Sequence, residues 1–475
     1  MKRLTTIMLS ALLLLALLPG CAKNEGFDES KIVLQFGAIS DLQHGNRSYD
    51  TVGTGKQALN RLKDKALEYT DKGLDAIFFA GDLVDHASTP EVEEFKTIYE
   101  SVLDPTEVPL IFCLGNHDVK ATGSQKEELN FDRFYDILGE EYRGYDEETS
   151  DLDAAGVHQI VNGYHFVALN PLDSGYSKHE NGSAPYAQET KDWLDKTLAE
   201  ITKKDPDKYI FLATHPMIYD TTYGSDLIVN NFAWFTKDLS DILKKYPQVV
   251  TFSGHLHFPI SDERSIMQTD FTSLGCGSVT YMATENGGYR YMKSLTVMED
   301  CNKVNVGYLV QVDKHGNVRF LRMNFRLNET IKEPWVIMAP QADGSHLLTY
   351  TEDRGSAANN PTPVLAADAI TVTDDRDTVS ADTPIRPHVT FKSATDDDQI
   401  HNYTLTVTDE SGAVVEEARL LADSYLHTDP ADMRDEWAFY LQRGLYERGR
   451  TYTVSLTAWD DWGAQSATVA YTYTT

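Results

Sequence analysis

Six side chains that can bind a metal follow strand-like runs of this 475-residue sequence, each at the point where a run ends. The apolar runs close in "FGAISD", "AIFFAGD", "LIFCLGNHD", "YIFLATHP" and "VVTFSGHLH". The six residues are Asp41, Asp82, Asn116, His215, His255 and His257. Open α/β sheets collect functional groups at the carboxyl ends of their strands, so we expect these side chains to meet at one edge. Carboxylate, amide and imidazole donors together predict a site for divalent metal ions.

The spacing of the last two histidines supports this prediction. His255 and His257 stand two residues apart, and in an extended chain such side chains project to the same side. They can then reach adjacent ions. Scattered carboxylates and histidines are usually surface or capping groups, but six of them at equivalent positions are hard to explain in that way.

The elements that must position these residues alternate along the first two thirds of the chain. From Lys31 to about Asn328, strand-like segments alternate with helix-like ones, which is typical of an α/β domain. The segment "QETKDWLDKTLAEI" predicts a helix, because Leu194, Leu198 and Ile201 recur at helical spacing and line one face. We expect such helices to cover the sheets.

The composition shifts beyond this region. We predict an α/β domain over residues 31–341, a linker over 342–360 that contains "EDRGSAANN", and a small all-β sandwich over 361–475, similar to immunoglobulin or fibronectin domains. Two hairpins are predicted there, in "HNYTLTVTDESGAVVEEARL" and in "TYTVSLTAWDDWGAQSATVAYTYT". Its aromatic side chains suggest either a glycan-binding face or, more simply, core packing. These residues are Trp437, Phe439, Tyr440, Trp459 and Trp462.

Four motifs in this order, "GDLVD", "GNHD", "THP" and "GHLH", resemble the signature of the calcineurin-like metallophosphoesterases. The resemblance implies a four-layer α/β (α+β) sandwich, with two mixed β-sheets flanked by helices, and a site for two divalent metal ions. It also implies how the ligands divide: Asp82 bridges the ions, Asn116, His215 and His255 bind one of them, and Asp41 and His257 bind the other.

The family usually begins with Asp-x-His, whereas here Gln43 stands two residues after Asp41 and His44 follows it. In extended chain the third position faces away, so we interpret Gln43 as a metal ligand. His44 could bind the metal only if a turn directed its side chain toward the site; otherwise it could contact the substrate. The alternative is that Gln43 leaves a coordination position filled by water. An amide oxygen favours Mn²⁺ or Mg²⁺ over Zn²⁺, with Fe or Zn as the other candidates.

The resemblance implies a phosphohydrolase in which hydroxide held by two ions attacks phosphorus. His117 in "GNHD" is the candidate general acid, and Asp118 is predicted to orient its imidazole. The alternative for His117 is a hydrogen bond that only supports the loop. Asp85, the second aspartate of "GDLVD", is predicted to support its loop or cap the next helix.

The substrate is expected to be a small phosphorylated molecule, with a phosphodiester, phosphoanhydride or phosphomonoester bond. Glutamine at position 43 also occurs in the branch that resembles manganese-dependent ADP-ribose and CDP-alcohol diphosphatases, which favours a nucleotide or nucleoside-diphosphate derivative. Tyr289 and Arg290 are candidates to stack a base and bind a phosphate, although ordinary loop packing explains them equally well. The competing hypothesis is a catalytically weak surface lipoprotein whose β-domain binds a ligand or glycan.

Charge and the first residues bear on partners and location. The formal net charge of −31 argues against nucleic acid as a partner, because phosphate backbones are bound through clustered Lys and Arg. Residues 1–20 combine a basic start with a short apolar run, which is typical of an export signal and too short for a stable membrane-spanning helix. "LPG" before Cys21 resembles a bacterial lipobox. We therefore predict an exported, membrane-anchored bacterial lipoprotein, lipidated at Cys21, on the periplasmic or cell-surface face.

Overall fold

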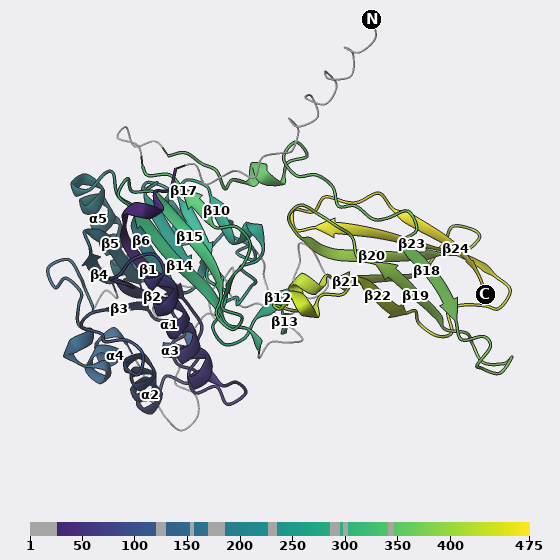
Figure 1. Cartoon of the computed structure of the whole chain (residues 1–475), viewed down its shortest axis with the longest axis horizontal. Helices are drawn as coiled ribbons and strands as arrows, with labels where there is room; N and C mark the ends of the chain where they lie inside the picture. The colour runs from purple at the N-terminus through teal and green to yellow at the C-terminus, as the bar shows by residue number, and fades with distance from the viewer. Residues whose placement is uncertain are drawn as a thin grey trace, which may run out of the picture.

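The computed structural model describes residues 26–119, 130–152, 156–169, 186–226, 235–285, 295–297, 303–340 and 346–475. Figure 1 shows an α/β part, formed by the N-terminal two thirds of the chain, and an all-β part at the C-terminus. The predicted fold class is confirmed for both parts.

The first sheet of the α/β part contains seven strands and is mixed. Its parallel strands are β1 (Ile32–Ile39), β2 (Ala76–Ala80) and β3 (Leu110–Cys113). The antiparallel strands that extend it are β14 (Val306–Asp313), β15 (Val318–Asn324), β16 (Glu329–Thr330) and β17 (Trp335–Ile337). Metal-ligand candidates follow β1, β2 and β3 directly, at the same edge.

The second sheet contains six strands and is also mixed. Its strands, in spatial order, are β10 (Ile266–Gln268), β11 (Thr272–Gly275), β9 (Val249–Ser253), β6 (Ile210–Thr214), β5 (Tyr164–Leu169) and β4 (Gly156–Val161). The central strands β11, β9, β6 and β5 are parallel, and β10 and β4 pair antiparallel at the edges. The remaining candidate ligands follow β6 and β9.

Aromatic side chains fill the space between the two sheets. Phe36 of the first sheet meets Phe166 and Phe211 of the second, with ring centroids 4.9 and 4.8 Å apart. Phe78 and Phe252 make a further edge-to-face pair at 5.6 Å. Such large buried rings supply much of the hydrophobic stabilisation and fix the distance between the sheets. The edge that carries the candidate ligands is therefore rigid.

Helices cover the outer faces of both sheets. On the first sheet lie α1 (Thr51–Leu67), which packs on β1 and β14, and then α2 (Thr89–Glu100) and α4 (Phe131–Leu138). The predicted helix is α5 (Gln188–Lys204), which packs on β4 with Leu194, Leu198 and Ile201 buried, beside α6 (Ser240–Leu243). One short helix, α3 (Asn116–Val119), holds the "GNHD" motif. This arrangement confirms the four-layer sandwich.

The C-terminal part consists of two antiparallel sheets around one hydrophobic cluster. One sheet contains β18 (Ile370–Asp374), β19 (Pro387–Lys392) and β22 (Glu436–Tyr440). The other contains β20 (Ile400–Thr408), β21 (Val414–Leu421), β23 (Thr451–Asp460) and β24 (Val469–Thr474). Both predicted hairpins, β20–β21 and β23–β24, are present.

The aromatic residues singled out in this domain differ in their surroundings. Trp437 is buried and stacks on Phe391, with centroids 5.8 Å apart. The indole N–H groups of Trp459 and Trp462 donate to Thr404 and Asp398. Core packing thus accounts for Trp437, whereas Tyr440 is 56% exposed and stacks on His388.

The two parts meet through a small buried junction. Tyr425 of the C-terminal domain is fully buried against Tyr223, Leu256 and Phe258 of the α/β domain. Two short ribbons complete the secondary structure: β7 (Met217–Ile218) with β8 (Phe235–Thr236), and β12 (Ala283–Glu285) with β13 (Leu295–Val297). Figure 1 shows the second ribbon beside the junction. No helix in the described ranges has the length and apolar character needed to cross a membrane.

Candidate metal centre

The backbone turns sharply at five of the seven candidate ligands. Their φ angles are positive: Asp41 58°, Gln43 45°, Asp82 56°, His255 72° and His257 57°. Residues other than glycine seldom adopt this left-handed region, and where they do so they cluster at functional sites. The strands thus end abruptly, and the residues after them turn toward one common volume.

This geometry corrects the reasoning from spacing. We expected Asp41, Gln43 and the histidines of "GHLH" to lie in extended chain, and the positive φ angles show that they do not. The side-chain directions inferred for positions 43 and 44 nevertheless hold. The Gln43 amide faces Asp82, with Nε2 3.3 Å from Oδ2. His44 faces away from the centre, with its ring nitrogens 3.1 Å from Thr51 Oγ1 and 2.9 Å from Glu94 Oε2.

One half of the centre forms around His215, which is fully buried. Its Nε2 lies 3.3 Å from Asp82 Oδ2 and 3.2 Å from Asn116 Oδ1. Its Nδ1 donates to the carbonyl of Ala80 at 2.8 Å, which leaves Nε2 as the metal-binding atom. Ligand atoms of Asp82, His215 and His255 all lie within 4.8 Å of one another.

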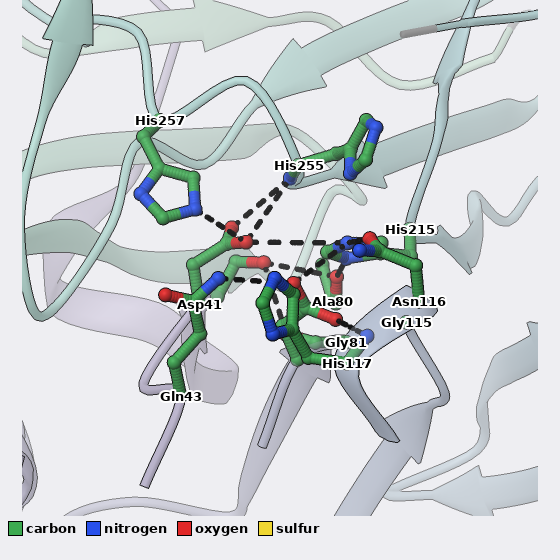
Figure 2. Close-up of polar contacts among 12 residues, drawn as sticks. Asp41, Gln43, Ala80, Gly81, Gly115, Asn116, His117, His215, His255 and His257 are labelled. Carbon is green, nitrogen blue, oxygen red and sulfur yellow. Dashed lines mark hydrogen bonds and ion pairs between the residues drawn. The ribbon is translucent and has the colours of Figure 1, made fainter. Parts of the chain in front are cut away.

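The other half forms around Asp41, whose Oδ1 lies 3.0 Å from His257 Nε2. His257 donates from Nδ1 to the carbonyl of Tyr281 at 2.9 Å, so again Nε2 faces the centre. Gln43 completes this half, and its buried Oε1 has no hydrogen-bond partner. Figure 2 shows Asp41, Gln43, His215, His255 and His257 around one small volume.

Two glycines make room for the carboxylates. A Cβ atom on Gly115 would lie 2.1 Å from Asp82 Oδ1, and a Cβ atom on Gly254 would lie 2.4 Å from Asp41 Oδ2. Any side chain at these positions would collide with the ligands. The glycines of "GNHD" and "GHLH" are therefore required by the close approach of the backbone to the site.

These residues fit divalent metal ions. Two buried carboxylates, those of Asp41 and Asp82, lie among imidazoles, and the Gln43 amide presents Nε2 to Asp82 while its buried Oε1 has no hydrogen-bond partner. A cation among Asp41, Asp82 and the histidines would neutralise the carboxylates, and a half-turn of the Gln43 amide about its last torsion would bring Oε1 to that cation. The mixture of oxygen and imidazole donors suits Mn²⁺, Mg²⁺, Fe and Zn²⁺.

The pKa values of the candidate ligands are shifted in different directions. Burial opposes the ionisation of Asp82, but His215, His117 and His255 outweigh it and hold its pKa far below the usual range. Burial, reinforced by His215, holds the pKa of His255 well below its usual value. An ionised carboxylate and a neutral imidazole are the forms that bind a metal. Burial opposes protonation of His215, but Asp82 and Asp41 outweigh it and raise its pKa to about 9, so a metal ion would have to displace a proton from His215.

The partner of His117 is Asp85 and not, as predicted, Asp118. His117 Nδ1 lies 3.0 Å from both Oδ1 and the carbonyl oxygen of Asp85. Asp118 is fully buried and accepts hydrogen bonds from the backbone N–H groups of Val84 (2.9 Å) and Gly115 (2.8 Å). Asp118 therefore holds two ligand-bearing loops together, and the prediction that it orients the imidazole is corrected.

His117 is positioned as a proton donor. Burial opposes protonation of its imidazole, but Asp82 and Asp85 outweigh burial and raise its pKa to about 10. Its side chain is 36% exposed, so the ring can meet a substrate. With Nδ1 held by Asp85, Nε2 remains to face a leaving group.

Reasoning from the sequence missed one aromatic contact at the centre. The Tyr281 ring lies 4.2 Å from the His257 ring and stacks on Tyr49 at 4.8 Å. No spacing distinguishes Tyr281 from other aromatics of its segment, so only the fold could identify it. Tyr289, Arg290 and Cys21 lie outside the described residues.

Comparison with known proteins agrees with this geometry. Residues 34–259 match the family model described as calcineurin-like phosphoesterase. This match contains every candidate metal ligand, and the four-layer fold of the N-terminal domain is that of a metallophosphoesterase. Both support a hydrolase that acts on phosphoric esters.

A curated relative from Rhodococcus erythropolis (strain PR4 / NBRC 100887), named "Probable cyclic nucleotide phosphodiesterase", is 26% identical over 234 residues, or 49% of this chain. The match covers 66% of that relative, just under two thirds. The solved structure of purple acid phosphatase PPD1 from yellow lupin (Lupinus luteus) is similar with a TM-score of 0.41 and 14% identity, over 64% of this chain and 53% of that one.

Proposed function

We propose that the chain is a dinuclear metal-dependent phosphohydrolase that acts on small phosphorylated substrates. The observation that carries the proposal is one cluster of buried metal-binding side chains: ligand atoms of Asp82, His215 and His255 lie within 4.8 Å of one another, and Asp41 Oδ1 lies 3.0 Å from His257 Nε2. Buried carboxylates and imidazoles packed this closely are compensated when a cation binds among them.

The arrangement assigns each residue a role. Asp82 lies between the two halves, near both His215 and Gln43, so it would be the ligand shared by both ions. Asn116, His215 and His255 would hold one ion, and Asp41, Gln43 and His257 the other. Two divalent ions supply an activated water and neutralise the charge of the phosphoryl group.

His117 would donate a proton from Nε2 to the leaving oxygen, while Asp85 fixes the ring through Nδ1. Proton donation matters most when the leaving group is a poor one, such as a sugar or alkyl oxygen. Gln43, as an oxygen donor in place of the usual imidazole, would favour Mn²⁺ or Mg²⁺ in its half of the centre.

For the substrate we propose a phosphodiester or a phosphoanhydride of nucleotide type. The name of the Rhodococcus relative, a cyclic nucleotide phosphodiesterase, supports a diester. The glutamine at position 43 supports an anhydride such as ADP-ribose or CDP-choline.

The experiment is Mn²⁺-dependent hydrolysis by the chelator-stripped chain without residues 1–20. Substrates are 3′,5′-cyclic AMP, ADP-ribose, CDP-choline, bis-p-nitrophenyl phosphate and p-nitrophenyl phosphate. We expect metal to restore turnover on a diester or an anhydride, and Asp82→Asn to abolish it. Two bound ions without turnover on any substrate would contradict the hydrolase and favour a binding protein.

We also propose export and lipidation at Cys21, from the pattern of residues 1–21. In a bacterial host, the full chain should enter the membrane fraction and incorporate radiolabelled palmitate. Cys21→Ala should be released in soluble form. Equal labelling of both proteins would contradict lipidation at this residue.

A further inference from the structure

A short segment after the "GHLH" motif touches the backbone of two ligand loops. We call residues Ser278–Ala283 the clamp segment. Three of its hydrogen bonds reach the loop that carries Asp41 and Gln43. They run from Val279 N to Ser40 O (3.1 Å), from Ser278 Oγ to Asp41 O (3.0 Å) and from Thr280 Oγ1 to Leu42 O (2.6 Å).

The same segment holds His257. The imidazole Nδ1 of His257 donates to Tyr281 O at 2.9 Å, and Ala283 N donates to His257 O at 3.1 Å. The Tyr281 ring packs on the imidazole with centroids 4.2 Å apart. The clamp segment therefore supports all three residues assigned to one ion: Asp41, Gln43 and His257.

The half of the centre around His215 is supported differently, from within the α/β core. His215 Nδ1 donates to Ala80 O, at the end of β2. The loop of Asn116 is held by Asp118 through Gly115 N. The loop of Asp41 and Gln43 is also bonded to the loop of Asp82, from Asp41 N to Gly81 O (3.0 Å) and from Gln43 N to Asp82 O (2.8 Å), so the clamp segment is an additional support of the Asp41 half.

The clamp segment runs directly into a contact with the C-terminal domain. Glu285, at the end of β12, is almost fully buried, and its Oε1 lies 2.6 Å from Nε2 of His401 on β20. His401 is also fully buried, and its ring lies 4.6 Å from that of Tyr425, at the junction. Two buried polar side chains in contact are costly to separate.

The ligands that depend on the clamp segment lie in strained backbone, with φ of 58° at Asp41, 45° at Gln43 and 57° at His257. Such conformations persist only where the surroundings over-determine them. The hydrogen bonds of the clamp segment are part of these surroundings.

We propose that the C-terminal domain positions one half of the metal centre, formed by Asp41, Gln43 and His257, through the contact of His401 with Glu285. His401 is a positioning residue in this scheme, since it acts through the clamp segment and does not touch the ions. The proposal rests on the two-ion centre of the proposed function.

The test measures Mn²⁺ affinity by calorimetry and electron paramagnetic resonance on the chelator-stripped chain with both domains. His401→Phe removes the imidazole, whereas His401→Gln keeps an N–H group near the position of Nε2. We expect His401→Phe to lower the affinity for one of the two Mn²⁺ ions about tenfold, which is the smaller effect seen when a residue that supports a metal ligand is removed. At limiting metal, the spin-coupled signal of the ion pair should disappear. His401→Gln should restore both.

Two backgrounds identify which ion is affected. Asn116→Ala should leave mainly the ion of the Asp41 half, and Gln43→Ala mainly the ion of the His215 half. Adding His401→Phe should lower the affinity for the remaining ion in the Asn116→Ala background and should leave that affinity unchanged in the Gln43→Ala background. The matched control is His388→Phe, another histidine of the same domain, which stacks on Tyr440 and should change neither ion.

Equal weakening in both backgrounds, or no weakening in either, would overturn the proposal. If His401→Phe does not fold, His401→Asn, which is too short to reach Glu285, takes its place with the same expectation. A parent chain that binds two ions but hydrolyses nothing contradicts the proposed function alone. A parent chain that binds fewer than two ions contradicts this proposal as well.

Discussion

Gln43 is the residue at which this centre departs from the usual pattern, and its oxygen sets the expected metal preference. Replacing the amide by imidazole in Gln43→His supplies a nitrogen donor, which binds Zn²⁺ better than an amide oxygen does. We expect the variant to retain activity and to shift its preference from Mn²⁺ toward Zn²⁺, measured as the ratio of kcat/KM with each metal.

The control for Gln43 is its neighbour. His44 contacts Thr51 and Glu94 rather than the centre, so His44→Ala should keep the metal profile of the parent. A metal profile that changes in His44→Ala and not in Gln43→His would show that His44 is the ligand.

His117 and Asp85 form a second pair of residues whose roles can be tested by substitution. His117→Ala should reduce kcat strongly, by about 10²- to 10⁴-fold, on substrates with poor leaving groups, and much less on p-nitrophenyl esters. Asp85→Asn should give a weaker form of the same pattern, since the imidazole loses its carboxylate partner. Metal content should stay at the parent level in both variants. Equal losses on good and poor leaving groups would remove His117 from the role of proton donor.

The sequence predicted which residues form the centre and where they stand in the chain better than it predicted which side chains contact one another. The motifs placed Asp41, Asp82, Asn116, His215, His255 and His257 at strand ends because chain order and strand polarity are local properties. The sequence could not show that Asp85, and not Asp118, contacts His117. Asp118 is engaged by the backbone N–H groups of Val84 and Gly115, and their directions are known only in the folded chain. The left-handed turns were missed too, since non-glycine residues rarely adopt them.

At the scale of elements, the β4–β5 hairpin contains a buried histidine pair. His158 Nε2 lies 2.9 Å from His165 Nδ1, and His165 Nε2 lies 3.1 Å from Asp205 Oδ2. Burial and the neighbouring His165 lower the pKa of His158 from 6.5 to about 4. The folded state therefore keeps His158 neutral in a pH range where the unfolded state binds a proton.

This difference gives a stability change with a definite sign. Between about pH 6.5 and pH 4 the unfolded chain binds more protons at His158, so the free energy of unfolding falls as the pH falls, by up to about 3 kcal/mol from this residue. Urea unfolding of the chelator-stripped chain at pH 7.0, 5.5 and 4.5 measures it. His158→Gln should have the shallower pH dependence, because carboxylates contribute equally to both proteins. Parallel curves would contradict the assignment.

Elements with regular periodicity were predicted well. Helix α5 and the hairpins β20–β21 and β23–β24 follow from repeating apolar positions, which depend only on neighbouring residues. The clamp segment has no periodicity and bonds mainly through its backbone. Its relation to the Asp41 loop joins residues far apart in the sequence, and only the folded chain brings them together.

For the whole molecule, the junction decides whether the two domains behave as one unit. Each has a separate hydrophobic core, and Tyr425 connects them. Its ring is buried among residues of the α/β domain, and its hydroxyl donates to Asp262 Oδ2 at 2.5 Å. Phe258, one residue after the ligand His257, belongs to the same cluster. The C-terminal sandwich therefore packs against a residue next to a candidate metal ligand.

We expect the parent protein to unfold in one calorimetric transition and Tyr425→Ala to unfold in two. Truncation of a large buried aromatic side chain costs about 3–5 kcal/mol, and here much of that loss falls on the contact between the domains. Tyr440→Ala is the control, since Tyr440 is 56% exposed and lies outside the junction. In the parent, Mn²⁺ should raise the single Tm. In Tyr425→Ala, Mn²⁺ should raise only the Tm of the transition that belongs to the α/β domain. Two independent transitions in the parent would show that the domains are uncoupled.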